Sequence, residues 1–321
     1  MLQRLLAPLG PAPLAEWLER YFARPGWVLS SETTPRWTGF VLEPASVLGG
    51  SAAAAAIAAA LVEVAVAAID IADDLIDGDW SGDLADQHRA TNAAVGLGLL
   101  GQAAIPLLGA ELGAERALRI AERAARWSLA SVSGQDQDVL NQHRLDVSED
   151  EALAVTRCKS GSLVRMAVEV GALVATDDDD VVRAVGDLGE AVGTIAQLLN
   201  DLAGVDTRAT GQKLDFRART KTVPVAFLLH SARESGHQHV LDWYAQSTPT
   251  SVEADGAAER ALSQLARDLG ALDFAWVLAD AQRREADAAL RAAATRLERP
   301  ELLDLLRLLP SVRARAARRT N

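Results

Sequence analysis

The sequence is poor in cysteine and in aromatic residues. Its 321 residues include a single cysteine, Cys158, so no disulfide can form within the chain, and we expect a reducing, cytoplasmic location. Aromatic residues make up only 4% of the chain, and β-branched or aromatic residues rarely alternate with polar ones. Because strong helix formers fill long stretches without a period of two, the sequence predicts an all-α protein.

Basic residues are also scarce relative to acidic ones. The chain has 44 acidic and 32 basic residues, which give a formal net charge of −12. Such a surface repels nucleic acid and anionic membranes, so we expect neither as a main partner. The N-terminus lacks the pattern of a secretory signal. The most apolar stretch, residues 51–72, is interrupted by Glu63 and Asp70, and we expect a buried core helix there rather than a transmembrane segment.

The hydrophobic pattern predicts one helical domain over residues 1–321. No linker rich in glycine, serine or proline and no internal repeat divides the chain. Pro106 is expected to kink its helix, and Ser148 with Glu151 predicts a capping box. The helices are predicted at residues 14–22, 51–79, 90–112, 115–142, 148–176, 180–205 and 222–234. Residues 24–50 are expected to form a loop or one or two short helices, and residues 206–213 a loop. Three or four further helices are expected in residues 235–319.

Four aspartates lie near the end of the most apolar predicted helix. Asp70, Asp73, Asp74 and Asp77 fall at i, i+3, i+4 and i+7, which places them along one helical face. Their like charges repel one another and oppose the dipole at this end of the helix. Carboxylates without histidine or cysteine suit Mg²⁺, which completes its shell with water and phosphate. The stripe therefore predicts a magnesium site opening into a cavity, rather than a solvated acidic face.

A second polar group stands far downstream. Gln197, Asn200, Asp201 and Gly204 share one helical face, which could oppose the aspartate stripe across a cavity. Asp206 lies off that face. An isolated Asn-Asp pair is more often a helix cap or a surface feature, so this group alone predicts little.

The aspartate stripe resembles the DDxxD motif of trans-isoprenyl diphosphate synthases and class I terpene synthases, which Asp73, Asp74 and Asp77 match position for position. The pair Asn200-Asp201 resembles the opening of the second metal-binding motif of these enzymes. Gly204 replaces its third ligand, and Arg208 stands where the glutamate of cyclases would be. The resemblance implies that the three aspartates are catalytic and that they, with Asn200 and Asp201, bind several Mg²⁺ ions together with the substrate diphosphate.

Three further segments resemble motifs of the same family. Residues 157–161 resemble its K-T-G segment, residues 134–138 its G-Q-x-x-D turn, and residues 213–224 its K-x-D…G-K-x-T-L-P region. The resemblance implies an isoprenoid synthase-like fold of about ten or more helices around a central cavity, a homodimer, and a prenyl diphosphate (C10–C20) as substrate. It assigns the diphosphate to Lys159, Lys213 and Lys221, and the substrate pocket to Gln135, Asp138, Gln197 and Asp70.

The chain lacks the groups with which chain-elongating members bind isopentenyl diphosphate. The upstream loop at residues 30–44 has Arg36 as its only basic residue, Val66 lies where a histidine is expected, and Gly82-Asp83 replace paired arginines. Each charge-assisted hydrogen bond lost from such a pocket costs about 1.5–3 kcal/mol. We therefore expect ionisation of an allylic diphosphate followed by terpene cyclisation.

Three alternatives stay open. The chain could transfer a prenyl group to a non-isoprenoid acceptor such as a peptide indole, or elongate a prenyl chain with isopentenyl diphosphate. It could also be a non-catalytic partner subunit of a prenyl synthase. Such a subunit tends to lose its metal-binding aspartates, whereas Asp73, Asp74 and Asp77 are all present here.

Overall fold

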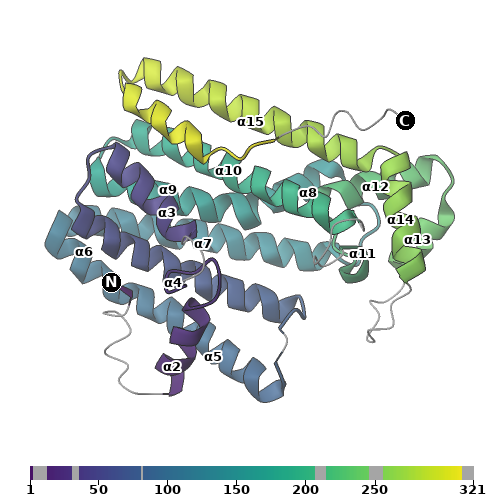
Figure 1. The fold of residues 1–321 in the computed structure, drawn as a ribbon, viewed down its shortest axis with the longest axis horizontal. Helices are drawn as coiled ribbons and strands as arrows, with labels where there is room; N and C mark the ends of the chain where they lie inside the picture. The colour runs from purple at the N-terminus through teal and green to yellow at the C-terminus, as the bar shows by residue number, and fades with distance from the viewer. Residues whose placement is uncertain (3–12, 31–35, 81, 207–214, 246–255, 313–321) are drawn as a thin grey trace. The chain divides into compact units, whose positions relative to one another are not determined.

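The computed structural model describes residues 1–2, 13–30, 36–80, 82–206, 215–245 and 256–312 (Figure 1). Every regular element in these ranges is a helix, which confirms the all-α prediction. The contacts within the chain divide it into two compact units. The first unit comprises residues 1–132, 162–190 and 287–308, and the second comprises residues 133–161, 191–286 and 309–321. Each unit is described separately, and the expectation of one domain stays a prediction.

Helix α4 (Ala52–Ile76) is the core helix of the first unit. It packs against α3, α5, α6 and α9. Ser51 begins it as an N-cap, because its hydroxyl accepts a hydrogen bond from the Ala54 N–H at 3.3 Å. The other elements that lie wholly in this unit are α2 (Pro13–Phe22), α3 (Arg36–Val47), α5 (Leu84–Leu100), α6 (Ala104–Leu112), α9 (Ser162–Ala175) and the 3₁₀ segments Gly101–Ala103 and Pro300–Leu308.

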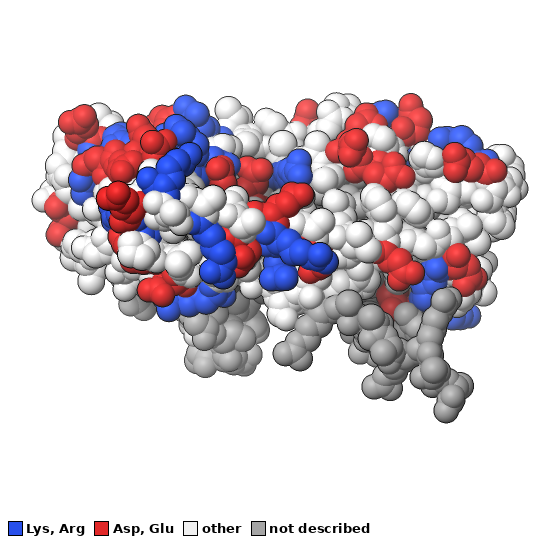
Figure 2. Space-filling model, turned by 90° about the horizontal axis from the view of Figure 1, so that it is seen from above, with Lys and Arg blue, Asp and Glu red and all other residues white. Residues whose placement is uncertain are grey.

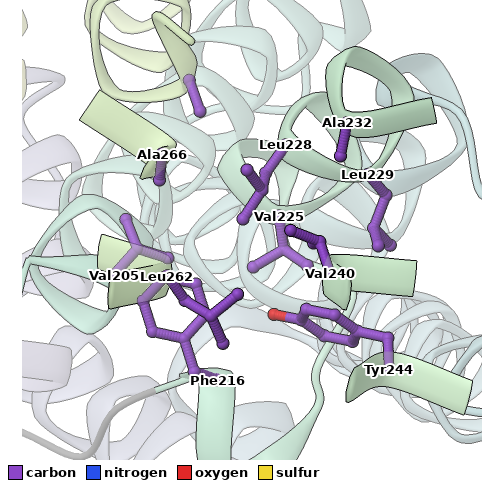
Figure 3. Packing of buried hydrophobic residues seen from close by; sticks show 11 residues of the cluster. Val205, Phe216, Val225, Leu228, Leu229, Ala232, Val240, Tyr244, Leu262 and Ala266 are labelled. Carbon is purple, nitrogen blue, oxygen red and sulfur yellow. The ribbon is translucent and has the colours of Figure 1, made fainter. Parts of the chain in front are cut away.

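The second unit has an apolar core of its own, shown in Figure 3. Val205, Phe216, Leu228 and Leu262 are almost completely buried there, and the ring of Tyr244 lies against the same cluster. Burial of a large apolar side chain of this kind stabilises a fold by about 1.5–3 kcal/mol. The elements that lie wholly in this unit are α8 (Glu149–Thr156), the π-helical segment Arg157–Gly161, α11 (Asp215–Ala218), α12 (Val223–Glu234), α13 (Gln238–Ala245) and α14 (Gly256–Asp268).

Three long helices contribute residues to both units, namely α7 (Ala114–Asn141), α10 (Asp179–Val205) and α15 (Ala271–Arg296). The start of α10 agrees with the sequence prediction, because Asp178 Oδ1 accepts from the N–H groups of Asp180 and Val181. The predicted capping box at Ser148 and Glu151 is also confirmed. Of the predicted loop at 206–213, residues 207–213 lie outside the described residues.

Two predicted helices were wrong in their details. The helix expected at 90–112 begins earlier, at Leu84, because Asp83 caps it by accepting from the Asp86 N–H at 2.9 Å. A 3₁₀ turn at 101–103 interrupts this helix before Pro106 is reached. The helix expected at 148–176 is divided by the π-helical segment at 157–161.

Two helical stretches, Ala52–Ile76 and Leu84–Leu112, are long and apolar enough to cross a membrane when judged by length and composition alone. Within the most apolar window of the first, 67% is buried inside the protein, as expected for a core helix. The corresponding share in the second is 28%, so that stretch leaves more of its apolar surface exposed.

Charged side chains of both signs are interspersed on the face shown in Figure 2. Many pair locally along helices, as Arg126 does with Glu122 and Arg291 with Asp287. Exposed pairs of this kind contribute about 0–1 kcal/mol each, so they affect solubility more than stability.

A close contact between α9 and α3 in the first unit depends on a glycine. A Cβ atom at Gly171 of α9 would lie 2.3 Å from the carbonyl oxygen of Val41 in α3, so a larger residue would push the two helices apart. We expect Gly171→Ala to lower the free energy of unfolding by about 1–3 kcal/mol, measured by urea denaturation. Gly98→Ala in α5 is the control, because nothing lies within 4 Å of its added Cβ, and it should be neutral or slightly stabilising. Equal stability of both variants would contradict this account.

Candidate active site

The end of α4 carries the aspartate stripe. Asp73, Asp74 and Asp77 are partly buried, and the Asp77 N–H donates to the carbonyl oxygen of Asp73 at 2.9 Å. The chain then turns at Gly78, whose φ of +72° is a conformation that favours glycine. This turn closes the helix just beyond the aspartates.

A tyrosine of helix α2 contacts Asp70, the first aspartate of the stripe. The buried Tyr21 hydroxyl donates to Asp70 Oδ2 at 2.5 Å, and Arg24 Nη2 lies 3.7 Å from the same oxygen. Burial and the hydrogen bond to Asp70 raise the pKa of Tyr21 above its usual range. Trp17 stacks on both Tyr21 and Trp80, with ring-centroid distances of 5.7 and 5.8 Å. Asp70 therefore has partners that compensate its charge.

The charge of Asp74 is less well compensated. Its pKa is raised to about 6, mainly by burial and also by Asp70, Asp79 and Asp73, although Arg24 opposes the increase. A bound cation would stabilise the ionised form, and carboxylate oxygens are the donors that Mg²⁺ prefers.

In the part of the chain that the structure describes, no three His, Cys, Asp or Glu side chains are grouped so that they could hold a metal ion by themselves. Magnesium commonly takes one or two carboxylates and completes its shell with water and substrate phosphate, so the motif still fits this ion. The assignment of Asp73, Asp74 and Asp77 as metal ligands stays a prediction.

In the second unit, a π-helical segment presents Lys159. Glycines of two helices approach this segment: a Cβ at Gly134 of α7 would lie 2.7 Å from the Lys159 nitrogen, and one at Gly193 of α10 would lie 2.4 Å from the Ser160 oxygen. The two glycines let backbone pack against backbone and fix the segment in place. Single π turns of this kind occur frequently at functional sites.

The structure brings four of the predicted site residues of this unit into contact in pairs. Lys159 Nζ lies 3.2 Å from Asp138 Oδ2, and Gln197 Nε2 donates to Asp201 Oδ1 at 2.8 Å. The Ser160 hydroxyl donates to Gln197 Oε1 at 3.1 Å and so joins the π-helical segment to the second motif. Gln135 is buried one turn before Asp138.

The two residues of the Asn-Asp pair have different surroundings. Asp201 is buried at 3% exposure, whereas Asn200 is exposed. Asp206, which lies off the face of the motif, is buried and pairs with Arg267 Nη1 at 3.0 Å. Of the predicted ligands and lysines, Lys213 lies outside the described residues, as does Arg208.

Lys221 is a buried cation of the same unit, with 3% of its surface exposed. Its Nζ donates to the carbonyl oxygens of Gln142 at 2.9 Å and Arg219 at 2.8 Å. Its pKa is lowered to about 8, mainly by burial and also by the nearby Arg219, while Asp138 opposes the change. Lys221 therefore lies close enough to Asp138 for an electrostatic interaction between the two side chains.

Sequence reasoning missed Tyr21, Arg24 and Arg219. The amphipathic pattern of residues 14–22 predicted that α2 packs on a core, but not that Tyr21 meets Asp70, 49 residues away. Nothing in the local pattern singled out Arg219, since its environment comes from residues of α13.

Comparison with known proteins agrees with the motifs. Residues 38–261 match the polyprenyl synthetase family. The chain is 30% identical over 198 residues to a geranylfarnesyl diphosphate synthase of Aeropyrum pernix, covering 60% of this chain and 58% of that protein. It is 28% identical over 281 residues to a geranylgeranyl diphosphate synthase of Mycobacterium tuberculosis, covering 84% and 77%. The matched part thus spans little more than half of the Aeropyrum relative.

Solved structures share the fold. A polyprenyl synthetase of Streptomyces coelicolor superposes with a TM-score of 0.79 at 24% identity, covering 96% of this chain and 95% of that one. A polyprenyl synthase of Caulobacter crescentus, solved with calcium and isoprenyl diphosphate, gives a TM-score of 0.72 at 21% identity, covering 95% and 93%. Together with the sequence match over residues 38–261, the helical fold and the aspartate motif, these findings show that the chain belongs to the polyprenyl synthetase family.

Proposed function

We propose that this chain ionises an allylic prenyl diphosphate (C10–C20) in a magnesium-dependent reaction. The observation that carries the proposal is the connected group of the second unit, in which Lys159 contacts Asp138 and the buried Lys221 lies near the same carboxylate. The resemblance to the family assigns the two lysines to the diphosphate and Asp138 to the substrate pocket. The intact DDxxD motif and a Caulobacter relative solved with calcium and isoprenyl diphosphate support a divalent ion.

The roles of the residues follow from their chemistry. Asp73, Asp74 and Asp77, with Asn200 and Asp201, would hold Mg²⁺, which when bound neutralises charge on the diphosphate. Lys159, Lys221 and Lys213 donate charge-assisted hydrogen bonds to the leaving diphosphate. The carbon–oxygen bond breaks, its electron pair leaves with the diphosphate, and an allylic cation remains. Gln135, Asp138, Gln197 and Asp70 are proposed to line the substrate pocket.

Cyclisation is our proposal for the fate of that cation. In the first unit, Thr38 donates to Glu63 Oε1 through its hydroxyl at 2.7 Å and its backbone N–H at 3.0 Å, so a buried acid occupies the neighbourhood of the upstream loop. The turn after the aspartate motif carries Asp79 and the helix cap Asp83. The exposed carboxylates of Asp79 and Asp83 disfavour a second diphosphate at this turn. With no such acceptor, the cation closes a ring and loses a proton, or is trapped by water.

Chain elongation with isopentenyl diphosphate is the second candidate, because the matched relatives from Aeropyrum and Mycobacterium are prenyl diphosphate synthases. Product growth on addition of isopentenyl diphosphate would favour it. Diphosphate release that depends on a peptide or other non-isoprenoid acceptor would favour transfer to that acceptor. If activity appeared only in a complex with another prenyl synthase and were unchanged by Asp73→Asn in this chain, this chain would be a non-catalytic partner subunit.

We further propose a homodimer acting in the cytoplasm. Large apolar side chains are exposed on the first unit, and the exposed Cys158, which forms no disulfide, fits a reducing compartment. A monomer mass in analytical ultracentrifugation would contradict the dimer. The most exposed of these side chains on the first unit are Leu84, Val95, Leu99, Leu118 and Leu129.

The proposed reaction is tested by incubating the protein and Mg²⁺ with geranyl, farnesyl and geranylgeranyl diphosphate. We expect a cyclic hydrocarbon or alcohol from at least one of them without isopentenyl diphosphate, detected by mass spectrometry, and no product after chelation of the metal. Asp74→Asn should lower turnover by at least about 100-fold, since charge stabilisation in the transition state is lost. Asp304→Asn, at an exposed carboxylate of the same unit, should leave turnover unchanged. No product from any of the three substrates would refute the proposal.

The pH dependence of anion binding tests the role of Lys221. Because its pKa is lowered to about 8, the ammonium loses its charge at a lower pH than an ordinary lysine does. Pyrophosphate affinity should therefore fall as the pH rises through about 8, measured by calorimetry. The arginine of Lys221→Arg keeps its charge over this pH range, so the fall in affinity near pH 8 should disappear in this variant. Pyrophosphate itself also titrates, but this affects both proteins equally. Identical pH profiles would contradict the role.

A further inference from the structure

Arg219 is a buried cation whose hydrogen-bonding capacity is not satisfied. Only 3% of the residue is exposed, and its Nε and Nη1 atoms have no hydrogen-bond partner among the described residues. Native proteins nearly always pair buried polar atoms, so such an exception calls for a physical reason. Burial also lowers the pKa of this guanidinium.

The backbone of Arg219 is unusual as well. Its φ of +56° lies in the left-handed region, which non-glycine residues other than asparagine and aspartate seldom adopt. Residues held in such conformations cluster at ligand-binding sites, where the surrounding structure fixes them. An unsatisfied side chain and a strained backbone thus coincide at one residue.

A second buried cation lies beside it. Lys221 Nζ donates to the carbonyl oxygen of Arg219 itself, and the two positive charges are close enough for Arg219 to lower the lysine's pKa. The carboxylate acting on Lys221 is that of Asp138, which also pairs with Lys159 at 3.2 Å. Asp138 is therefore shared by two lysines, and none of the described carboxylates pairs with Arg219.

Aromatic rings compensate these charges only in part. The Arg219 guanidinium carbon lies 5.1 Å from the centroid of the Trp243 ring, and Lys221 Nζ lies 4.9 Å from that of Tyr244. Figure 3 shows Tyr244 among the buried apolar side chains of this unit, next to Val240. Apolar surroundings strengthen the attraction of an anion to nearby cations, and a ring face offers no lone pair to the unsatisfied N–H groups.

We propose that Arg219 and Lys221 together bind the diphosphate group, with Arg219 as a ligand additional to the lysines of the family motifs. The group could belong to the prenyl substrate or to the released pyrophosphate, whose phosphate chemistry is the same. Phosphate oxygens accept from the unsatisfied Nε and Nη1 atoms and supply the missing negative charge. The inference rests on the proposed function only for the identity of the bound molecule.

A purely structural arginine would behave differently from a ligand. If Arg219 only anchored Trp243, its removal would destabilise the protein and leave anion binding unaffected. If it is held for an anion, replacement by an apolar side chain removes an uncompensated buried charge, and the ligand-free protein becomes more stable. The two roles therefore predict opposite changes in Tm.

The experiment compares wild type, Arg219→Met and Arg219→Lys with Arg233→Met as the control. Arg233 is an exposed arginine of α12 in the same unit, which donates to the carbonyl oxygen of Leu145. Binding of inorganic pyrophosphate, inorganic phosphate and an unreactive thio-linked prenyl diphosphate is measured by calorimetry in the presence of Mg²⁺. Thermal unfolding is followed without ligand.

We expect Arg219→Met to raise Tm and to weaken pyrophosphate binding by at least about tenfold, while Arg219→Lys loses less and Arg233→Met does not change. If affinity for pyrophosphate and for the prenyl analogue falls equally, Arg219 binds the diphosphate group in both molecules. If only affinity for the analogue falls, Arg219 binds the diphosphate of the substrate alone. The inference is overturned if Arg219→Met and Arg219→Lys both bind the two ligands with affinities within twofold of wild type, whatever their Tm. If wild type and Arg233→Met bind pyrophosphate but make no product, the proposed function fails and the site stands.

Discussion

Incompletely compensated like charge is the constraint on which the candidate site depends. In the first unit, acidic side chains gather on and just after α4, and burial raises the pKa of Asp74 to about 6. In the second unit, the cations of Arg219 and Lys221 lie side by side with few acceptors. Each arrangement costs stability in the ligand-free protein, and each is relieved by a ligand of opposite charge. A divalent cation such as Mg²⁺ would relieve the first arrangement, and a diphosphate would relieve the second.

The packing around these charges explains why they stay in place. The Tyr21 hydroxyl and the stacked Trp17 and Trp80 rings fix the aspartate-bearing end of α4. Gly134 and Gly193 allow the π-helical segment with Lys159 to pack directly against two helices. Both arrangements restrict the movement of the side chains proposed to bind the ligands. Preorganisation of this kind reduces the free-energy cost of binding.

Local features of the fold could be predicted from the sequence, and features set by distant contacts could not. The capping box at Ser148 is encoded within a few residues, so it was predicted correctly. The stripe from Asp70 to Asp77 is equally local, and its role as a magnesium site stays a prediction. The π-helical break at 157–161 depends on two glycines of other helices, and the partner of Asp70 comes from α2. The charge imbalance at Arg219 likewise arises only when α13 packs beside it. Membership of the polyprenyl synthetase family followed from motif spacing, whereas the fate of the prenyl cation depends on the shape of a pocket that no motif encodes.

The central claim is that this chain binds Mg²⁺ and a diphosphate together, and this can be measured without knowing the substrate. Calorimetry of pyrophosphate binding at a series of Mg²⁺ concentrations reports the coupling free energy between the two ions, which is reciprocal by thermodynamic linkage. The account predicts that Mg²⁺ strengthens pyrophosphate binding by at least about tenfold and that Asp74→Asn removes most of this gain. Pyrophosphate affinity that is independent of Mg²⁺, or a gain that Asp74→Asn leaves intact, would contradict it.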